Sequence, residues 1–339
     1  MSVRHWALRL ESAWDAARLR RAGSRTPRQF RFEPYLGHGG PAGVVVRGRA
    51  LDDPPSTQAV EGEGARAALA RTLRHFMTDE LPGVPLRIVV ADAVEETVTD
   101  AEGYFQATLH PDADRLRSPW TGGTVELSGD YRGVSAPRTT PGEVRVPGPE
   151  AEFAFISDID DTILETGVQR VGRMVRQTLT GSALTRSAFP GAPELYRDLA
   201  SDANPVFYVS SSPWNLHAFL LAFLRHRRFP LGPVLLRDLL GTAAGREEKA
   251  GRIQEILDLH PQLRFVLIGD SGEKDPEVYA EVVRANPGRI LAVYIREVRL
   301  DPGDGRVEKV SGTWSDDVPF VLAADSDAVR RHAGELGLL

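Results

Sequence analysis

The sequence contains no cysteine among its 339 residues. Disulfide bonds, thiolate metal sites and cysteine nucleophiles are therefore excluded, and the composition fits a reducing compartment. No apolar run reaches the roughly 18–20 residues that a membrane-spanning helix needs, and residues 1–29 lack the apolar segment of a signal peptide. These absences predict a cytoplasmic protein without a transmembrane segment.

Lysine is also scarce. The formal net charge is −6, and only three of the 41 lysine and arginine residues are lysines, namely Lys249, Lys274 and Lys309. A mildly acidic chain lacks the basic surface that nucleic-acid binding usually requires, so we expect no nucleic-acid partner. Because arginine is the usual basic residue of this chain, each lysine is a candidate for a specific role.

The chain has enough apolar material for real cores, since 42% of its residues are hydrophobic. At roughly 100–200 residues per domain, its length predicts two domains. Within the segment 1–29, the pattern over 4–22 predicts an amphipathic helix, with Trp6, Leu10 and Trp14 at helical spacing. Such a helix either packs onto a domain or lies on a membrane surface with its tryptophans at the interface.

Residues 30–147 predict a β-rich, sandwich-like domain. Phe105, Ala107 and Leu109 alternate with polar residues, as expected for a half-buried strand. Gly- and Pro-rich turns separate short strands in the manner of a sandwich, and residues 66–77 predict a helix. The strands are expected near 44–50, 86–90, 96–99, 105–109, 122–127 and 142–146. Without a cluster of catalytic residues, this domain is interpreted as a binding or scaffolding module.

Residues 148–325 have a different pattern, and 326–339 predict a helical tail. Short apolar runs at 153–157, 206–210, 265–268 and 290–295 alternate with helical patterns near 193–201, 213–225, 247–259 and 276–285. Continuous apolar strands alternating with helices indicate an α/β fold whose parallel sheet is buried on both faces. Ligands of such sheets bind at the carboxyl ends of the strands, so the residues at those ends are the candidate site.

The first of these strands ends in the acidic residues Asp158, Asp160 and Asp161. Carboxylates this close repel one another unless a cation lies between them. Oxygen ligands of this kind suit Mg²⁺, which also binds phosphate oxygens. The alternative is an acidic turn without an ion.

The second strand ends in Ser210, Ser211 and Ser212, followed by Pro213. Pro213 fits the first position of a helix with Ser212 as its N-cap, and hydroxyl and free N–H groups there can bind an anion. The alternative is a plain helix cap. We interpret His217 as a packing or surface residue rather than the partner of a catalytic serine.

The third strand ends at Asp270, and Asp275 follows directly before a proline. Asp275 fits a helix N-cap as well as an ion partner. Lys249 begins the preceding helix, where a positive charge opposes the helix dipole, and an anionic partner would offset that cost.

The order of these groups is specific: acids, hydroxyls, a lysine and then a second acidic pair. It resembles the haloacid dehalogenase superfamily of phosphotransferases. The segments 156–163, 189–191, 208–215 and 267–277 further resemble the catalytic domain of the actin-patch-protein-type phosphatidate phosphatases, which are lipin-like. Asp161 stands where lipins have glycine and the actin-patch type has aspartate.

The resemblance implies a fold, a chemistry and a role for each group. The fold is a haloacid dehalogenase-like Rossmannoid sheet with a small cap or none, preceded by the sandwich-like domain. Asp158 is the expected nucleophile, forming an aspartyl-phosphate, and Asp160 the acid–base group. The resemblance assigns phosphate binding to Ser210, Ser211, Asn215 and Lys249, and Mg²⁺ binding to Asp158, Asp160, Asp270 and Asp275.

The expected substrate is phosphatidate or a related phospholipid monoester, reached at a membrane surface by a peripheral protein. The segment between the first two motifs has no room for a large cap, so large substrates could enter. Two alternatives stay open. One is a phosphatase of a soluble metabolite or phosphoprotein, and the other is a scaffolding protein with a vestigial site.

Overall fold

The structure is a computed structural model. It describes residues 25–52, 79–164, 188–200, 203–237, 245–298, 314 and 317–339. The helices predicted over 4–22 and 66–77 lie outside these residues, as do residues 165–187 between the first two motifs. Among the described residues, none forms a helix that is both long and apolar enough to cross a membrane.

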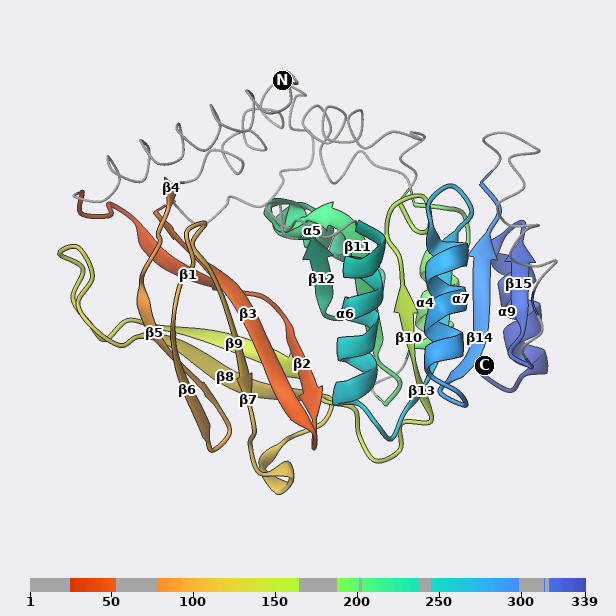
Figure 1. The fold of residues 1–339 in the computed structure, drawn as a ribbon, viewed down its shortest axis with the longest axis horizontal. Coiled ribbons are helices and arrows are strands. Elements are labelled where there is room, and N and C mark those ends of the chain that lie inside the picture. The colour runs from red at the N-terminus through yellow and green to blue at the C-terminus, as the bar shows by residue number, and fades with distance from the viewer. Residues whose placement is uncertain are drawn as a thin grey trace, which may run out of the picture.

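The N-terminal region is β-rich, as predicted, and its strands are joined into a single nine-stranded sheet (Figure 1). Apart from the parallel β2–β9 pair, its paired strands are antiparallel. The elements are β1 Phe30–Pro34, β2 Gly37–Gly40, β3 Gly43–Asp52, β4 Asp79–Glu80, β5 Pro85–Val90, β6 Ala93–Val98, β7 Tyr104–Leu109, the short helix η1 Ala113–Arg115, β8 Trp120–Leu127 and β9 Thr139–Arg145.

Side chains that alternate between buried and exposed positions along the strands explain why these residues form a sheet. Phe105, Ala107 and Leu109 are buried on one side of β7, and β5 buries every second residue. The inward residues of the sheet form one apolar core. The six predicted strands are all present, whereas β1, β2 and β4 were missed; β2 is rich in glycine and β4 has only two residues.

The C-terminal region holds a six-stranded parallel sheet in the order β12-β11-β10-β13-β14-β15. This confirms the predicted α/β class with a parallel sheet. The four predicted strands are its centre, and two short strands at its edges were missed. The strands are β10 Phe153–Ser157, β11 Val206–Pro213, β12 Val234–Arg237, β13 Arg264–Asp270, β14 Ile290–Arg296 and β15 Phe320–Ala323.

Helices cover both faces of this sheet, which explains its apolar strands. On β10, Phe155 packs toward α4, α5 and α9, whereas the next residue, Ile156, packs toward α6 and α7. The helices are α4 Ala192–Leu199, α5 His217–His226, α6 Gly245–Leu259, α7 Asp275–Ala285 and α9 Ser326–Glu335, and η2 Trp214–Leu216 precedes α5.

The helix after β11 begins later than predicted. Pro213 is the last residue of β11, and the N-cap of η2 is Pro213 rather than Ser212. The prediction was wrong because the hydroxyl of Ser212 is used elsewhere: it donates to Asp160 at 2.9 Å instead of capping the helix.

The β-rich region packs directly against the parallel-sheet region. The ring of Tyr35 stacks on Trp214 at 5.2 Å and on His217 at 3.9 Å between centroids. Arg47 on β3 forms an ion pair with Glu255 on α6. His217 is therefore a packing residue, as predicted. The two regions share buried aromatic and ionic contacts.

Buried histidines predict an acid-sensitive fold. Burial lowers the pKa of both His260 and His217 to about 3. In the unfolded chain a histidine titrates near 6.5, so each contributes stability that is complete above that pH and is lost as pH falls toward 3. For one such histidine, the free energy of unfolding should be about 2 kcal/mol lower at pH 5 than at pH 8.

Urea unfolding of His260→Asn at the two pH values tests this. The variant should show about 2 kcal/mol less pH dependence than the wild type. His226→Asn is the control, because His226 is exposed, and it should keep the wild-type pH dependence. Equal pH dependence in His260→Asn and wild type would contradict the prediction.

Candidate active site

The predicted site residues meet at the carboxyl edge of the parallel sheet. Asp158 directly follows β10, Ser210 lies near the end of β11, and Asp270 is the last residue of β13. β10 lies between β11 and β13 in parallel pairing, so these ends are neighbours. Lys249, in the second turn of α6, and Asp275, the first residue of α7, complete the group.

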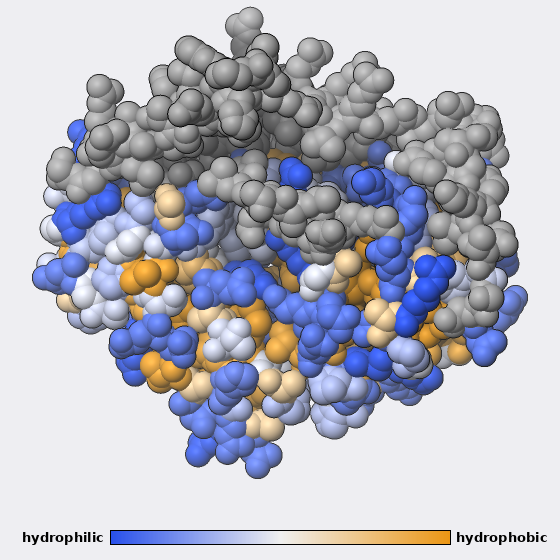
Figure 2. Space-filling view, viewed as in Figure 1, coloured by the Kyte–Doolittle hydropathy of each residue, from blue (hydrophilic) through white to orange (hydrophobic). Residues whose placement is uncertain are grey.

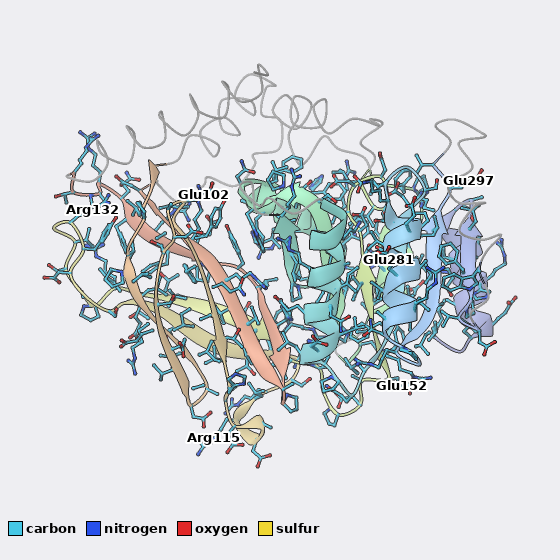
Figure 3. All side chains as sticks on the ribbon, viewed as in Figure 1. Glu102, Arg115, Arg132, Glu152, Glu281 and Glu297 are labelled. Atoms are coloured by element: carbon cyan, nitrogen blue, oxygen red, sulfur yellow. The ribbon has the colours of Figure 1, made fainter. Side chains whose placement is uncertain are left out.

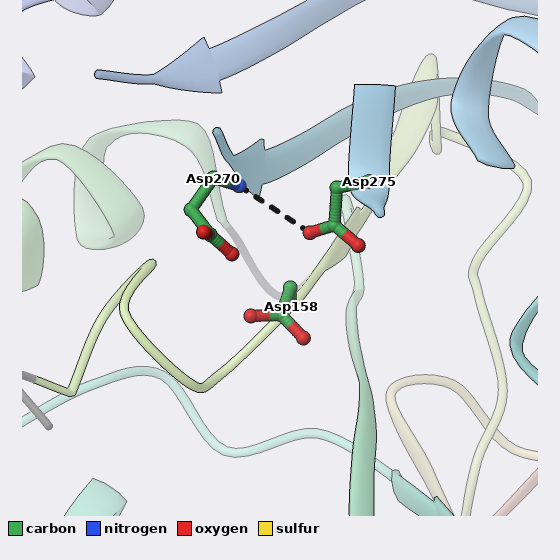
Figure 4. Close-up of side chains that lie close together, drawn as sticks. All are labelled: Asp158, Asp270 and Asp275. Atoms are coloured by element: carbon green, nitrogen blue, oxygen red, sulfur yellow. Dashed lines mark hydrogen bonds between the residues drawn. The ribbon is translucent and has the colours of Figure 1, made fainter. Parts of the chain in front are cut away.

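Three buried carboxyl groups form its acidic centre. Oxygens of Asp158, Asp270 and Asp275 lie within 4.8 Å of one another (Figure 4). Asp270 Oδ1 accepts hydrogen bonds from the backbone N–H groups of Gly272 at 2.6 Å and Glu273 at 3.0 Å. Its Oδ2 and that of Asp158 are buried and have no hydrogen-bond partner among the described residues.

Lys249 supplies the positive charge in this cluster. Its Nζ donates to Asp158 Oδ1 at 2.8 Å and, in an even closer contact, to Asp275 Oδ1. Burial alone would lower the pKa of Lys249, but the two carboxylates outweigh it and raise that pKa well above its ordinary value. The lysine is therefore a fixed cation, which explains a positive charge so near the start of a helix.

One lysine does not balance three carboxylates. Burial, reinforced by neighbouring carboxylates, raises the pKa of Asp270 to about 8 and that of Asp158 well above its ordinary range. A divalent cation would favour the ionised forms of these groups. The two unpartnered oxygens and the all-oxygen donor set fit such a cation.

Asp160 is held separately, on the serine side of the site. Its Oδ2 accepts hydrogen bonds from the hydroxyls of Ser210 at 2.8 Å and Ser212 at 2.9 Å. Burial raises the pKa of Asp160, and the two serine hydrogen bonds partly oppose this rise. The hydrogen-bond partners of Asp160 thus differ from those of Asp158, which accepts from Lys249.

The remaining candidates are placed less centrally. Ser211 is half-buried, and the side-chain oxygen of Asn215 is buried without a hydrogen-bond partner among the described residues. Lys274 is exposed. Asp161 is buried and has a φ of 55°, a left-handed conformation that favours glycine and tolerates aspartate.

The interpretation of Asp275 as an N-cap was wrong. Lys274 is the N-cap residue of α7, and the Asp275 carboxylate instead accepts from Lys249 and from the backbone N–H of Asp270 at 3.3 Å. An aspartate directly before a proline has the local pattern of a cap. Its actual partners lie on other elements and could not be seen in that pattern.

Two site residues were missed. Ser212 was interpreted as a cap, although the three consecutive serines already offered two hydroxyls on one side of the strand. Glu273 was not considered. Burial and the nearby acids raise its pKa to about 7, while Lys249 opposes this rise. The only sequence signal for Glu273 was its place between Asp270 and Asp275.

Comparison with known proteins supports the assignment of this region. Residues 153–297 match the family "Phosphatidate phosphatase APP1, catalytic domain". Phosphatidate phosphatase APP1 of Saccharomyces cerevisiae is 35% identical over 151 residues, which are 42% of this chain and 26% of that protein. The uncharacterized protein C29B5.04c of Schizosaccharomyces pombe is 32% identical over 156 residues, 44% of this chain and 26% of that protein.

The chain thus spans about a quarter of the length of these curated relatives. Among solved structures, a class C acid phosphatase from Bacillus anthracis is 16% identical in sequence. The match covers 55% of this chain and 80% of the acid phosphatase chain. Its TM-score of 0.31 is too low to establish a common fold. The resemblance predicted from the strand-end motifs is confirmed by sequence for residues 153–297, which are similar to the catalytic domain of the phosphatidate phosphatase APP1 family.

Proposed function

We propose that this chain is a Mg²⁺-dependent phosphatase that hydrolyses phosphomonoesters through an aspartyl-phosphate. The observation that carries the proposal is the buried cluster of Asp158, Asp270, Asp275 and Lys249 at the strand ends. A solvated acidic turn would have no reason to bury three carboxyl groups around a lysine. The match of residues 153–297 to a phosphatidate phosphatase family supports the same reaction class.

The metal would be held by the unpartnered oxygens of Asp158 and Asp270. Both Asp275 oxygens already have partners, so we assign it to orienting Lys249 and Asp270. The backbone carbonyl of Asp160 is the further ligand implied by the family resemblance. When bound, Mg²⁺ offsets negative charge on the phosphoryl oxygens.

In the first step, a carboxylate oxygen of Asp158 attacks phosphorus. A bond from that oxygen to phosphorus forms, the bond to the leaving oxygen breaks, and Asp160 gives its proton to that oxygen. The raised pKa of Asp160 favours the protonated form that this step requires. Lys249 holds Asp158 in place and offsets charge on the phosphoryl group.

In the second step, water attacks phosphorus and Asp160 takes a proton from that water. The bond between phosphorus and the Asp158 oxygen breaks, so phosphate is released and Asp158 is restored. Ser210 and Ser212 keep the Asp160 carboxyl oriented in both steps. Ser211 and Asn215 are assigned to phosphate binding, since neither side chain forms a hydrogen bond among the described residues.

The substrate proposed for this site is phosphatidate or a related phospholipid monoester, bound at a membrane surface. The family match supports it. We also propose that residues 148–325 form a haloacid dehalogenase-like domain, preceded by a separate β-rich domain over 30–147. The N-terminal segment 1–29 would then guide the protein to lipid.

Phosphate release is the direct test, measured with Mg²⁺ or with EDTA on phosphatidate, lysophosphatidate, sugar phosphates and a phosphopeptide. Phosphatidate should be hydrolysed fastest, and EDTA should reduce the rate at least about 100-fold. Asp158→Asn protein serves as the blank. Activity confined to soluble esters would leave the mechanism and remove the lipid substrate. Full activity in EDTA would contradict the metal.

A further inference from the structure

A groove of about 710 Å³ lies between the β-rich region and the parallel-sheet region. Its walls come from both regions, so neither part of the chain forms it alone. The lining includes Arg47, Val98 and Tyr104 on the β-rich side and Trp214, Gly251 and Arg252 on the other side.

Two residues of the groove wall, Trp214 and Arg252, are close in the chain to residues of the candidate active site. Gly251 and Arg252 follow Lys249 within one turn of α6, and residues three apart on a helix are surface neighbours. Trp214 follows the serine segment that ends β11. Asp100 and Tyr104 line the opposite wall, and Glu102 between them lies toward the same side of the view as Glu297, which follows β14 (Figure 3). The groove and the strand ends are therefore at one edge.

The packing of α6 does not explain why residue 251 is a glycine. It lies inside a 15-residue helix, where glycine costs roughly 1 kcal/mol relative to alanine. An added Cβ would meet no atom of the described residues within 4 Å, and the φ of Gly251 is not positive. Neither backbone conformation nor a close neighbour requires glycine here. What glycine does provide is open space on the side of α6 that lines the groove.

The lining suits an amphiphile rather than an ion. Val98 on β6 is 61% exposed, and the lining also includes the aromatic residues Tyr104 and Trp214. Arg252 lies with its guanidinium carbon 5.8 Å from the Trp214 ring centre, while Arg47 is neutralised by Glu255. On the face seen in Figure 2, small hydrophobic patches are likewise mixed with hydrophilic surface. Polar groups and exposed apolar surface thus share one groove.

We propose that this groove receives the leaving-group part of the substrate, an alcohol with a polar linkage near the phosphate and an apolar chain beyond it. The inference rests on the proposed phosphatase function. It assigns the β-rich region a role in substrate selection, because one wall of the groove belongs to that region. Gly251 leaves space for the apolar chain along the α6 wall of the groove.

Two variants test this in the full-length chain. Gly251→Leu fills the groove from α6, and Val98→Asp places a charge on the opposite wall. The quantity measured is kcat/KM for monomeric dioctanoyl phosphatidate divided by kcat/KM for p-nitrophenyl phosphate, which has no chain. This ratio should fall at least tenfold in each variant, and Gly251→Ala should give a smaller decrease.

Matched controls separate the groove from general effects. Gly334→Leu is also a helical glycine with open space, but on α9. Val94→Asp lies on the same strand as Val98 and is 45% exposed, yet it does not line the groove. Both controls should keep the wild-type ratio.

An unchanged ratio in Gly251→Leu and Val98→Asp would overturn the inference, as would an equal decrease in the controls. If the wild type hydrolyses neither substrate, the proposed function fails. Equilibrium binding of dioctanoyl phosphatidate to the wild type and the two variants then tests whether the groove binds the substrate. Binding at least tenfold weaker in both variants than in wild type keeps the groove inference. Equal binding rejects it.

Discussion

Asp158→Asn is expected to lower phosphatase kcat at least about 10⁴-fold, because an amide oxygen cannot form the aspartyl-phosphate. The substitution keeps the size of the side chain. It also removes one of the three clustered carboxylates, which relieves repulsion within a buried group. The protein should therefore fold at least as well as the wild type while losing its activity.

Phosphate release and thermal unfolding, measured on the same preparation, check both halves of this expectation. Asp198→Asn is the matched control: Asp198 is half-exposed on α4, where it pairs with Arg330, and its rate should stay within about twofold of wild type. A rate for Asp158→Asn within tenfold of wild type would rule out Asp158 as the nucleophile.

Lys249→Met is expected to reduce both activity and stability. Methionine keeps the length of the side chain but leaves the carboxyl groups of Asp158 and Asp275 without their cation. Removing one partner of a buried ion pair typically costs about 3–5 kcal/mol. Loss of the charge near the phosphoryl group should also reduce kcat about 10²–10³-fold.

Urea unfolding in EDTA should show this loss of stability, and added Mg²⁺ should reduce it because the ion supplies positive charge to the same carboxyl groups. Lys274→Met is the control, since Lys274 is an exposed lysine near the same strand end. If Lys249→Met and Lys274→Met unfold at the same urea concentration in EDTA, Lys249 does not balance the acidic cluster.

The local sequence determined where the candidate catalytic residues lie. Apolar runs of four to six residues predicted the central strands, since only a sheet covered on both faces keeps such strands dry. Each run was followed by polar residues, and parallel pairing brings such ends to one edge. Asp158, Ser210 and Asp270 were therefore predictable as neighbours without any knowledge of distances.

Tertiary structure decided which atoms pair with which. Ser212 and Asp275 both fit helix caps by local pattern, yet Ser212 bonds to Asp160 and Asp275 to Lys249. A cap is read from residues a few positions apart, whereas these partners are 52 and 26 residues away. Glu273 was missed for a related reason, because its burial depends on how the loop after β13 folds.

The relation between the two halves of the chain was also beyond the sequence. The β-rich region was expected to be a binding or scaffolding module, and nothing in its pattern indicated that Tyr35 would stack on Trp214 or Arg47 pair with Glu255. Hydrophobic periodicity shows which face of an element is buried but not which partner buries it. The sequence by itself therefore determined the strand ends and their charges, while the pairing of those charges and the groove beside them arose only when distant segments packed together.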